Sequence, residues 1–247
     1  MPRFSRPEIE INYEVHGAGF PLLIFAPGGL GSQLAFWRHA PRNPDAAPIW
    51  MNPMVDLAAD FTVVAMDQRH AGASHAPITA DGGWHDYASD QLALMDHLGH
   101  RRFHAMGGCI GASFCLKLCE LVPERIAAAV LQNPIGLHDN RAYWDDSLRA
   151  FDDAMRARDP SLSEAALRGF GQNMFGGDFV FSVTREYVAR CEVPLFLQPG
   201  DDTPHPRATS DEIARLVPGI EIQHDWKGPH KPESIVRVRD FLRRHTP

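Results

Sequence analysis

Short apolar runs and amphipathic stretches alternate along most of the chain. Apolar and polar residues alternate from residue 8 to 15, which predicts a half-buried strand. Later runs are almost wholly apolar and are bounded by Gly, Pro or Asp, a pattern typical of strands that are covered on both faces. We predict such strands at residues 21–26, 61–66, 102–106, 127–131 and 194–197.

Between these runs, apolar residues recur at helical spacing, as Leu92, Met95 and Leu98 do. Helices are therefore predicted at residues 87–98, 112–121, 212–217 and 232–244. The repeated order of strand and helix predicts an α/β fold whose central sheet is mostly parallel, with helices on both faces. Ligands of such sheets bind beyond the carboxyl ends of the strands, so chemistry is expected in the loops that follow the apolar runs.

One segment, residues 137–190, interrupts this alternation. It contains helical stretches at 143–158 and 163–173, many aromatic residues and no convincing strand. We predict a helical lid over 137–190, inserted into a core formed by residues 1–136 and 191–247. The alternative is a set of ordinary packing helices. In either case an insertion opposite the strand ends would shape a pocket.

Composition narrows the class of protein without naming its function. The chain has 247 residues, 44% of them hydrophobic and 22% charged, so it can form a full core without metal or disulfide support. Its net charge of −7 argues against a nucleic-acid partner. The first residues lack the apolar stretch of a leader, and no run approaches the roughly 18 apolar residues of a membrane helix. We expect a cytoplasmic monomer or homodimer that acts on a small molecule.

The cysteines point to no metal site. Cys115 and Cys119 lie one helical turn apart, but no histidine or carboxylate completes a ligand set at the spacing of zinc sites. Cysteine packs as a small hydrophobic residue, so both are predicted to be buried thiols. We expect no cofactor and no metal.

The most specific motif is Gly-x-Cys-x-Gly around Cys109, between an apolar run and a helix. This is the pattern of a nucleophile elbow with cysteine in place of serine. Gly107 and Gly111 are explained if the nucleophile sits on a strained turn that excludes a Cβ on either side. The N-terminus of the helix favours a thiolate, and the N–H of Ile110 is a candidate oxyanion donor. The alternative is a tight turn with a buried structural cysteine.

Three further loops follow predicted strands. Glycines surround Leu30 after the first buried run, and the N–H of Gly29 is our candidate for the second oxyanion donor; a simple turn or a phosphate loop is the alternative. Asp202, with Asp201 in reserve, ends a late strand, where a carboxylate could orient an imidazole or cap a helix. His230 lies on a Gly-Pro turn after the last strand. The chain has 13 histidines, and only its position distinguishes His230.

The chain order Cys109, Asp202, His230 is the order of an α/β-hydrolase triad. Over most of its length the sequence resembles α/β-hydrolase-fold enzymes of the small esterase and lactonase type, including the Asp-x-Arg-x-x-Gly-x-Ser turn at residues 67–74. It departs from them at Cys109, where serine is usual, and at Gly108 and Pro27, where histidine is usual. The cysteine is similar to that of dienelactone hydrolase, whereas the predicted lid is similar to that of serine-dependent enol-lactonases.

The resemblance implies hydrolysis of an ester, lactone or thioester through an acyl-thioester on Cys109, with His230 as the base and Asp202 orienting it. The alternatives are an acyltransferase, lyase or cofactor-free oxygenase on the same fold, or a ligand-binding protein with a degenerate site. Arg141 could meet a substrate carboxylate, but a solvated surface arginine is the favoured interpretation. The candidate pocket residues are Leu30, Trp37, Trp144 and Phe175.

Overall fold

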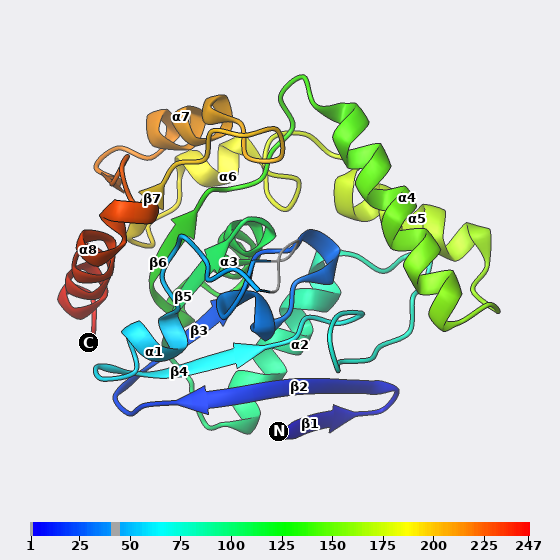
Figure 1. The fold of residues 1–247 in the computed structure, drawn as a ribbon, viewed down its shortest axis with the longest axis horizontal. Coiled ribbons are helices and arrows are strands. Elements are labelled where there is room, and N and C mark those ends of the chain that lie inside the picture. The colour runs from blue at the N-terminus through cyan, green and yellow to red at the C-terminus, as the bar shows by residue number, and fades with distance from the viewer. Residues whose placement is uncertain (1, 41–44) are drawn as a thin grey trace.

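The computed structural model describes residues 2–40 and 45–247. In these residues an 8-stranded sheet has the order β1-β2-β4-β3-β5-β6-β7-β8 (Figure 1). β1 pairs with β2, and β2 with β4, in antiparallel register, and every other pair is parallel, which confirms the predicted mostly parallel sheet. The strands are β1 (Arg3–Arg6), β2 (Ile9–His16), β3 (Phe20–Phe25), β4 (Phe61–Met66), β5 (Phe103–Gly108), β6 (Ile126–Gln132), β7 (Leu195–Gln198) and β8 (Glu221–Ile222).

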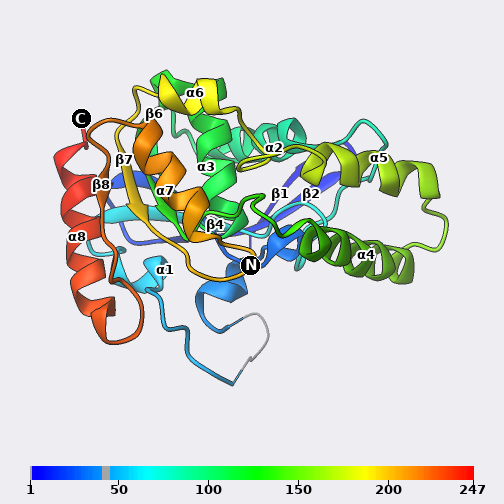
Figure 2. The same cartoon turned by 90° about the horizontal axis from the view of Figure 1, so that it is seen from above.

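Helices cover both faces of the sheet because its central strands are apolar on both sides. Along β3, Leu23 and Phe25 face one apolar cluster, and Leu22 and Ile24 face another. Helices α2, α3 and α7 pack in the first cluster, and α1 and α8 in the second (Figure 2). The helices are α1 (Pro53–Asp56), α2 (Trp84–His97), α3 (Ile110–Leu121), α4 (Arg141–Arg158), α5 (Glu164–Phe175), α6 (Arg185–Ala189), α7 (Arg207–Leu216) and α8 (Lys231–Arg244).

The predicted strands and helices are all present, with ends shifted by a few residues. The largest shift is at α7, which begins at Arg207, five positions before the predicted residue 212. The elements that the pattern did not indicate are short, as β8 (2 residues), α1 (4) and α6 (5) are. Elements of this length complete too few periods to be recognised from apolar spacing.

Residues 137–190 form α4, α5 and α6 and contain no strand. Their aromatic side chains pack on one another and on the core: the Trp144 and Phe175 ring centroids are 4.8 Å apart, and Trp84 on α2 donates to the carbonyl oxygen of Met174 at 2.9 Å. The segment therefore shares the apolar cluster of α2 and α3. Whether it acts as a lid, separate from the core, stays a prediction.

The turn at residues 67–74 has a structural explanation. The Asp67 carboxylate accepts from the Asn12 side chain at 2.8 Å and from the Leu34 and Ala73 backbone N–H groups at 2.9 Å. This buried carboxylate ties β2, the loop after β3 and the turn itself together. In the part of the chain that the structure describes, no helix is long and apolar enough to cross a membrane.

Candidate active site

Cys109 occupies a strained turn between β5 and α3. Its backbone has φ 60° and ψ −123°, outside the regions that L-residues prefer. A Cβ on Gly107 would lie 2.1 Å from the carbonyl oxygen of Gly111, and one on Gly111 would lie 2.5 Å from that of Phe25. These contacts explain the two glycines of the motif, because only glycine lets the turn pass so close to its neighbours.

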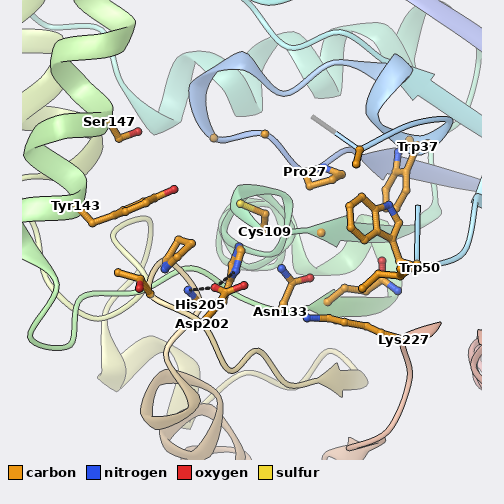
Figure 3. A pocket seen from close by; sticks show the side chains of 18 of the residues that line it. Pro27, Trp37, Trp50, Cys109, Asn133, Tyr143, Ser147, Asp202, His205 and Lys227 are labelled. Atoms are coloured by element: carbon orange, nitrogen blue, oxygen red, sulfur yellow. Dashed lines mark hydrogen bonds and ion pairs between the residues drawn. The ribbon is translucent and has the colours of Figure 1, made fainter. Parts of the chain in front are cut away.

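The Asp202 carboxylate pairs with His205, and the prediction of His230 as its partner is wrong. The Nδ1 atom of His205 lies 2.5 Å from the carboxylate, and the His205 backbone N–H donates to the same oxygen at 3.1 Å. Figure 3 shows the imidazole of His205 between Asp202 and Cys109. The fold therefore brings a thiol, an imidazole and a carboxylate together, but the imidazole is that of His205 and not that of His230.

The reason for this difference is local. Asp202 and His205 belong to one turn after β7 that is closed by an isolated β-bridge, so a separation of three residues suffices to join them. His230 ends a short turn of 3-10 helix (Gly228–His230) before α8, where it is exposed and does not line the cavity. The reserve acid, Asp201, is 80% exposed and forms an ion pair with Lys227 at 3.8 Å.

The thiol and the imidazole shift each other's pKa. Burial alone would raise the pKa of Cys109, but the positive charge and polar N–H of nearby His205, together with the Gly28 and Gly29 N–H groups, lower it to about 7. Burial alone would lower the pKa of His205, but the charge of Cys109 and the hydrogen bond to Asp202 raise it to about 9. Between these values the pair is a thiolate facing an imidazolium, the reactive form of a cysteine nucleophile.

Backbone N–H groups of the loop after β3 lie near the Cys109 sulfur. Gly29 opens a short 3-10 helix (Gly29–Gly31) after β3, and Gly28 before it has φ 124°. Ile110 is the first residue of α3, and the first N–H groups of a helix have no acceptor within it. That the Gly29 and Ile110 N–H groups hold an oxyanion stays a prediction; the Gly28 N–H group, which the motif did not single out, acts on the Cys109 sulfur together with that of Gly29.

A cavity of about 670 Å³ opens above Cys109. Of the predicted pocket residues, Trp37 and Trp144 line it, whereas Leu30 and Phe175 are buried in the apolar cluster of α2 and α3. Arg141 does not line it: the guanidinium donates to the Phe175 and Gly177 carbonyl oxygens, in a role that the sequence did not indicate. Trp50, an aromatic residue that the sequence also allowed in the pocket, lines the cavity, and the lining residues that the sequence analysis did not assign to it are Asn133, Tyr143, Ser147 and Lys227.

A chain of buried amides fixes the strand ends that carry these side chains. Gln132 on β6 donates to Gln198 on β7 at 2.6 Å, and Gln198 donates to Gln223 after β8 at 2.9 Å. The Asn133 N–H donates to the carbonyl oxygen of Gln198 at 2.6 Å. Bonds between buried amides hold three neighbouring strand ends in register, so the turn with Asp202 and His205 begins from a rigid edge.

The pKa of the thiol is lowered at Cys109 and Cys191 and raised at Cys115 and Cys119. Cys115 and Cys119 are fully buried, as the sequence predicts, and burial raises the pKa of Cys115 well above the ordinary value. Cys191 is partly exposed, and a hydrogen bond from Cys119 lowers the pKa of its thiol. Any measurement of thiol reactivity must therefore assign each adduct to its residue.

Alkylation of Cys109 by iodoacetamide should follow an apparent pKa of about 7. In the variant His205→Gln the imidazolium is gone and burial dominates, so the pKa of the thiol should rise to 9 or above. The thiolate fraction at pH 7 then falls from about one half to about 1%, and the alkylation rate by about fiftyfold. Peptide mass spectrometry separates Cys109 from Cys191. An unchanged pH profile in His205→Gln would show that His205 does not control the thiol.

Two curated relatives are similar in sequence to about half of this chain. A relative from Variovorax paradoxus named "Putative carbamate hydrolase RutD" is 32% identical over 123 residues, which cover 50% of this chain and 42% of the relative. The namesake from Azorhizobium caulinodans is 28% identical over 134 residues, or 54% of this chain and 44% of the relative. This chain thus matches less than half of the length of these relatives.

Two solved structures match the whole fold. The enol-lactonase of Burkholderia xenovorans is 18% identical, with a TM-score of 0.66 and coverage of 98% of this chain and 100% of that one. The meta-cleavage product hydrolase of Pseudomonas fluorescens is 16% identical, with a TM-score of 0.70 and coverage of 96% of each chain. The α/β hydrolase fold family model matches residues 21–216, a range that includes Cys109, Asp202 and His205. This chain belongs to the α/β hydrolase fold family.

Proposed function

We propose that the protein hydrolyses a small carboxylic ester, lactone or thioester, with Cys109 as nucleophile, His205 as acid and base, and Asp202 orienting His205. The observation that carries this proposal is the His205 ring, which lies between the Asp202 carboxylate and the Cys109 thiol and whose charge helps to lower the pKa of that thiol to about 7. This is the arrangement that activates a cysteine for acyl transfer.

In the first half of the reaction, the Cys109 thiolate attacks the substrate carbonyl carbon. The negative charge moves to the carbonyl oxygen, where the Gly29 and Ile110 N–H groups stabilise it by about 3 kcal/mol each. The bond between this carbon and the leaving oxygen then breaks. The Nε2 proton of the His205 imidazolium passes to that oxygen, so a neutral alcohol departs and an acyl-thioester remains on Cys109.

The second half uses the now neutral imidazole as a base. His205 takes a proton from water, and the hydroxide formed attacks the thioester carbonyl. The carbon–sulfur bond breaks, the carboxylic acid leaves, and Cys109 returns to the thiolate opposite the imidazolium. Asp202 keeps Nδ1 protonated throughout, so that Nε2 is the atom that exchanges protons.

A thiolate favours some substrates over others because it is a good leaving group. A tetrahedral intermediate whose other leaving group is poor, such as an amine, returns to the substrate by expelling sulfur. Activated esters and enol-lactones are therefore better candidates than amides. A substrate panel should include an aryl carbamate, because the names of the two relatives above specify carbamates.

Helix α4 supports the proposal that residues 137–190 form a lid. Tyr143, Trp144 and Ser147 all lie on α4 and line the cavity that contains Cys109. A substrate that reaches the sulfur would therefore contact this segment, which would hold the substrate over Cys109 and shield it from bulk solvent while admitting the one water that hydrolyses the acyl-thioester.

The test is mass spectrometry of the intact protein within seconds of mixing it with aryl esters, lactones and an aryl carbamate. The expected result is a mass increase equal to one acyl group, which maps to Cys109 and disappears as product forms. The variant Cys109→Ala should show no adduct. Turnover without any adduct on Cys109, or an adduct that is never released, would contradict the proposed reaction.

A further inference from the structure

The cavity has two chemically different sides. Figure 3 shows Tyr143 and Ser147 on one side of Cys109, and Trp37, Trp50 and Lys227 on the other. Tyr143 and Ser147 come from α4, whereas Trp37, Trp50 and Lys227 come from loops beyond the strand ends. A substrate whose carbonyl meets Cys109 would extend toward both sides, and each side would select a different group.

The backbone on each side of Lys227 is fixed. The Trp226 indole donates to the carbonyl oxygen of Pro199 at 2.9 Å, and the Gly228 N–H donates to that of Ile49 at 2.7 Å. The Lys227 ammonium lies 4.8 Å from the centre of the Trp226 ring, and the side chain is 26% exposed. The ammonium is thus held at the cavity rather than extended into solvent.

The charge of Lys227 is only partly compensated. Its ion-pair partner among the described residues is Asp201, at 3.8 Å, which is longer than a hydrogen bond. Asp201 is 80% exposed, and a pair of this kind contributes little. Lys227 and the imidazolium of His205 are the cationic side chains among the described residues that line the cavity; His205 pairs directly with the carboxylate of Asp202, on which Lys227 acts only through space, without an ion pair. Lys227 is therefore the cation that remains for a ligand.

Other hydrogen-bond donors belong to the same side of the cavity. The side chain of Asn133 lies between His205 and Lys227 in Figure 3 and lines the cavity. The indole N–H groups of Trp37 and Trp50 are buried and have no acceptor among residues 2–40 and 45–247. Because these indole N–H groups have no exposed surface, the further donor that a ligand can reach on this side is the side-chain amide of Asn133.

We propose that the substrate carries a carboxylate, separate from the carbonyl that reacts, and that Lys227 binds this carboxylate on the Trp37, Trp50 and Asn133 side of the cavity. The inference rests on the proposed acyl hydrolysis and adds the substrate class: a monoanionic ester or lactone. One ammonium matches one carboxylate, and the tryptophan rings accommodate the apolar chain that joins the carboxylate to the reacting carbonyl. Lys227 is a specificity-determining residue that leaves bond cleavage to Cys109 and His205.

The test compares two matched pairs of esters. For the acyl side, the pair is 4-nitrophenyl hydrogen adipate and methyl 4-nitrophenyl adipate; for the leaving-group side, it is 4-acetoxybenzoate and its methyl ester. The wild type should prefer the anion in one of these pairs by at least about tenfold in kcat/KM, because a hydrogen bond to a charged group contributes about 1.5–3 kcal/mol. Lys227→Met should lower that preference by tenfold or more, and Lys227→Arg should retain most of it.

Lys231→Met is the matched control, because Lys231 begins α8 outside the cavity and its loss changes the net charge equally. It should leave the preference unchanged. Equal selectivity in Lys227→Met and the wild type, or an equal loss in Lys231→Met, would overturn the proposal. Cleavage of the neutral esters through Cys109 without any preference for an anion would remove this inference and leave the proposed hydrolysis standing.

Binding tests the carboxylate site without catalysis. In Cys109→Ala, the tryptophan fluorescence should respond to monomethyl adipate at concentrations at least about tenfold lower than to dimethyl adipate. The additional change Lys227→Met should remove this difference. Equal responses to the two probes in Cys109→Ala would refute the carboxylate site even if no ester of the panel were hydrolysed.

Discussion

Replacement of Cys109 by alanine should lower the turnover of an aryl ester by at least about a thousandfold. Removal of a covalent nucleophile leaves only the contribution of the oxyanion donors and of substrate binding, and losses of this size or larger are typical. The measurement is kcat for a 4-nitrophenyl ester, with the melting temperature as a check on folding. The small change in volume at a position that is 9% exposed should preserve the fold.

The variant Cys109→Ser separates the nucleophile from the elbow geometry. A hydroxyl on the same backbone keeps the position of the attacking atom but removes the charge that raises the pKa of His205. We expect the histidine of this variant to titrate lower than about 9, and the acyl-ester on serine to accumulate more than the thioester does. Full turnover in Cys109→Ala would show that Cys109 is not the nucleophile.

Much of the fold could be predicted because its signals are local. The buried strands are short apolar runs, and α2, α3 and α8 display apolar residues at helical spacing. The elbow was also predictable, since Gly107 and Gly111 are required by backbone contacts that any residue with a Cβ would break. A glycine that is required by its immediate neighbours can be recognised from the local sequence alone.

The partner of the acid could not be predicted in the same way. In the resembling enzymes the histidine follows the last strand, and the order of motifs therefore pointed to His230. The competing signal was the segment Asp202-Thr203-Pro204-His205, in which an acid and a histidine share one turn. Whether that turn folds back over Cys109 depends on the packing of Pro206 and α7 against the sheet edge, which no local pattern shows. The position of a histidine in the order of motifs did not identify the partner of Asp202. The geometry of the turn that contains both Asp202 and His205 identifies it.

The strongest discrimination between the two histidines comes from paired alanine variants. His205→Ala should lower kcat/KM for an aryl ester by at least about a thousandfold, because the thiol loses the positive charge that ionises it and the leaving oxygen loses its proton donor. His230→Ala should change kcat/KM by less than about twofold, since the side chain is exposed and does not line the cavity.

The pH profile separates a catalytic role of His205 from a structural one. In the wild type, kcat/KM should rise with an apparent pKa of about 7 and fall above about 9, as first the thiolate forms and then the imidazolium loses its proton. In His205→Ala both limbs should disappear, and the residual rate should rise continuously with pH as the isolated thiol ionises. A bell-shaped profile that survives in His205→Ala and vanishes in His230→Ala would assign the proton transfers to His230 and require the loop at residues 226–230 to reach over Cys109 during catalysis.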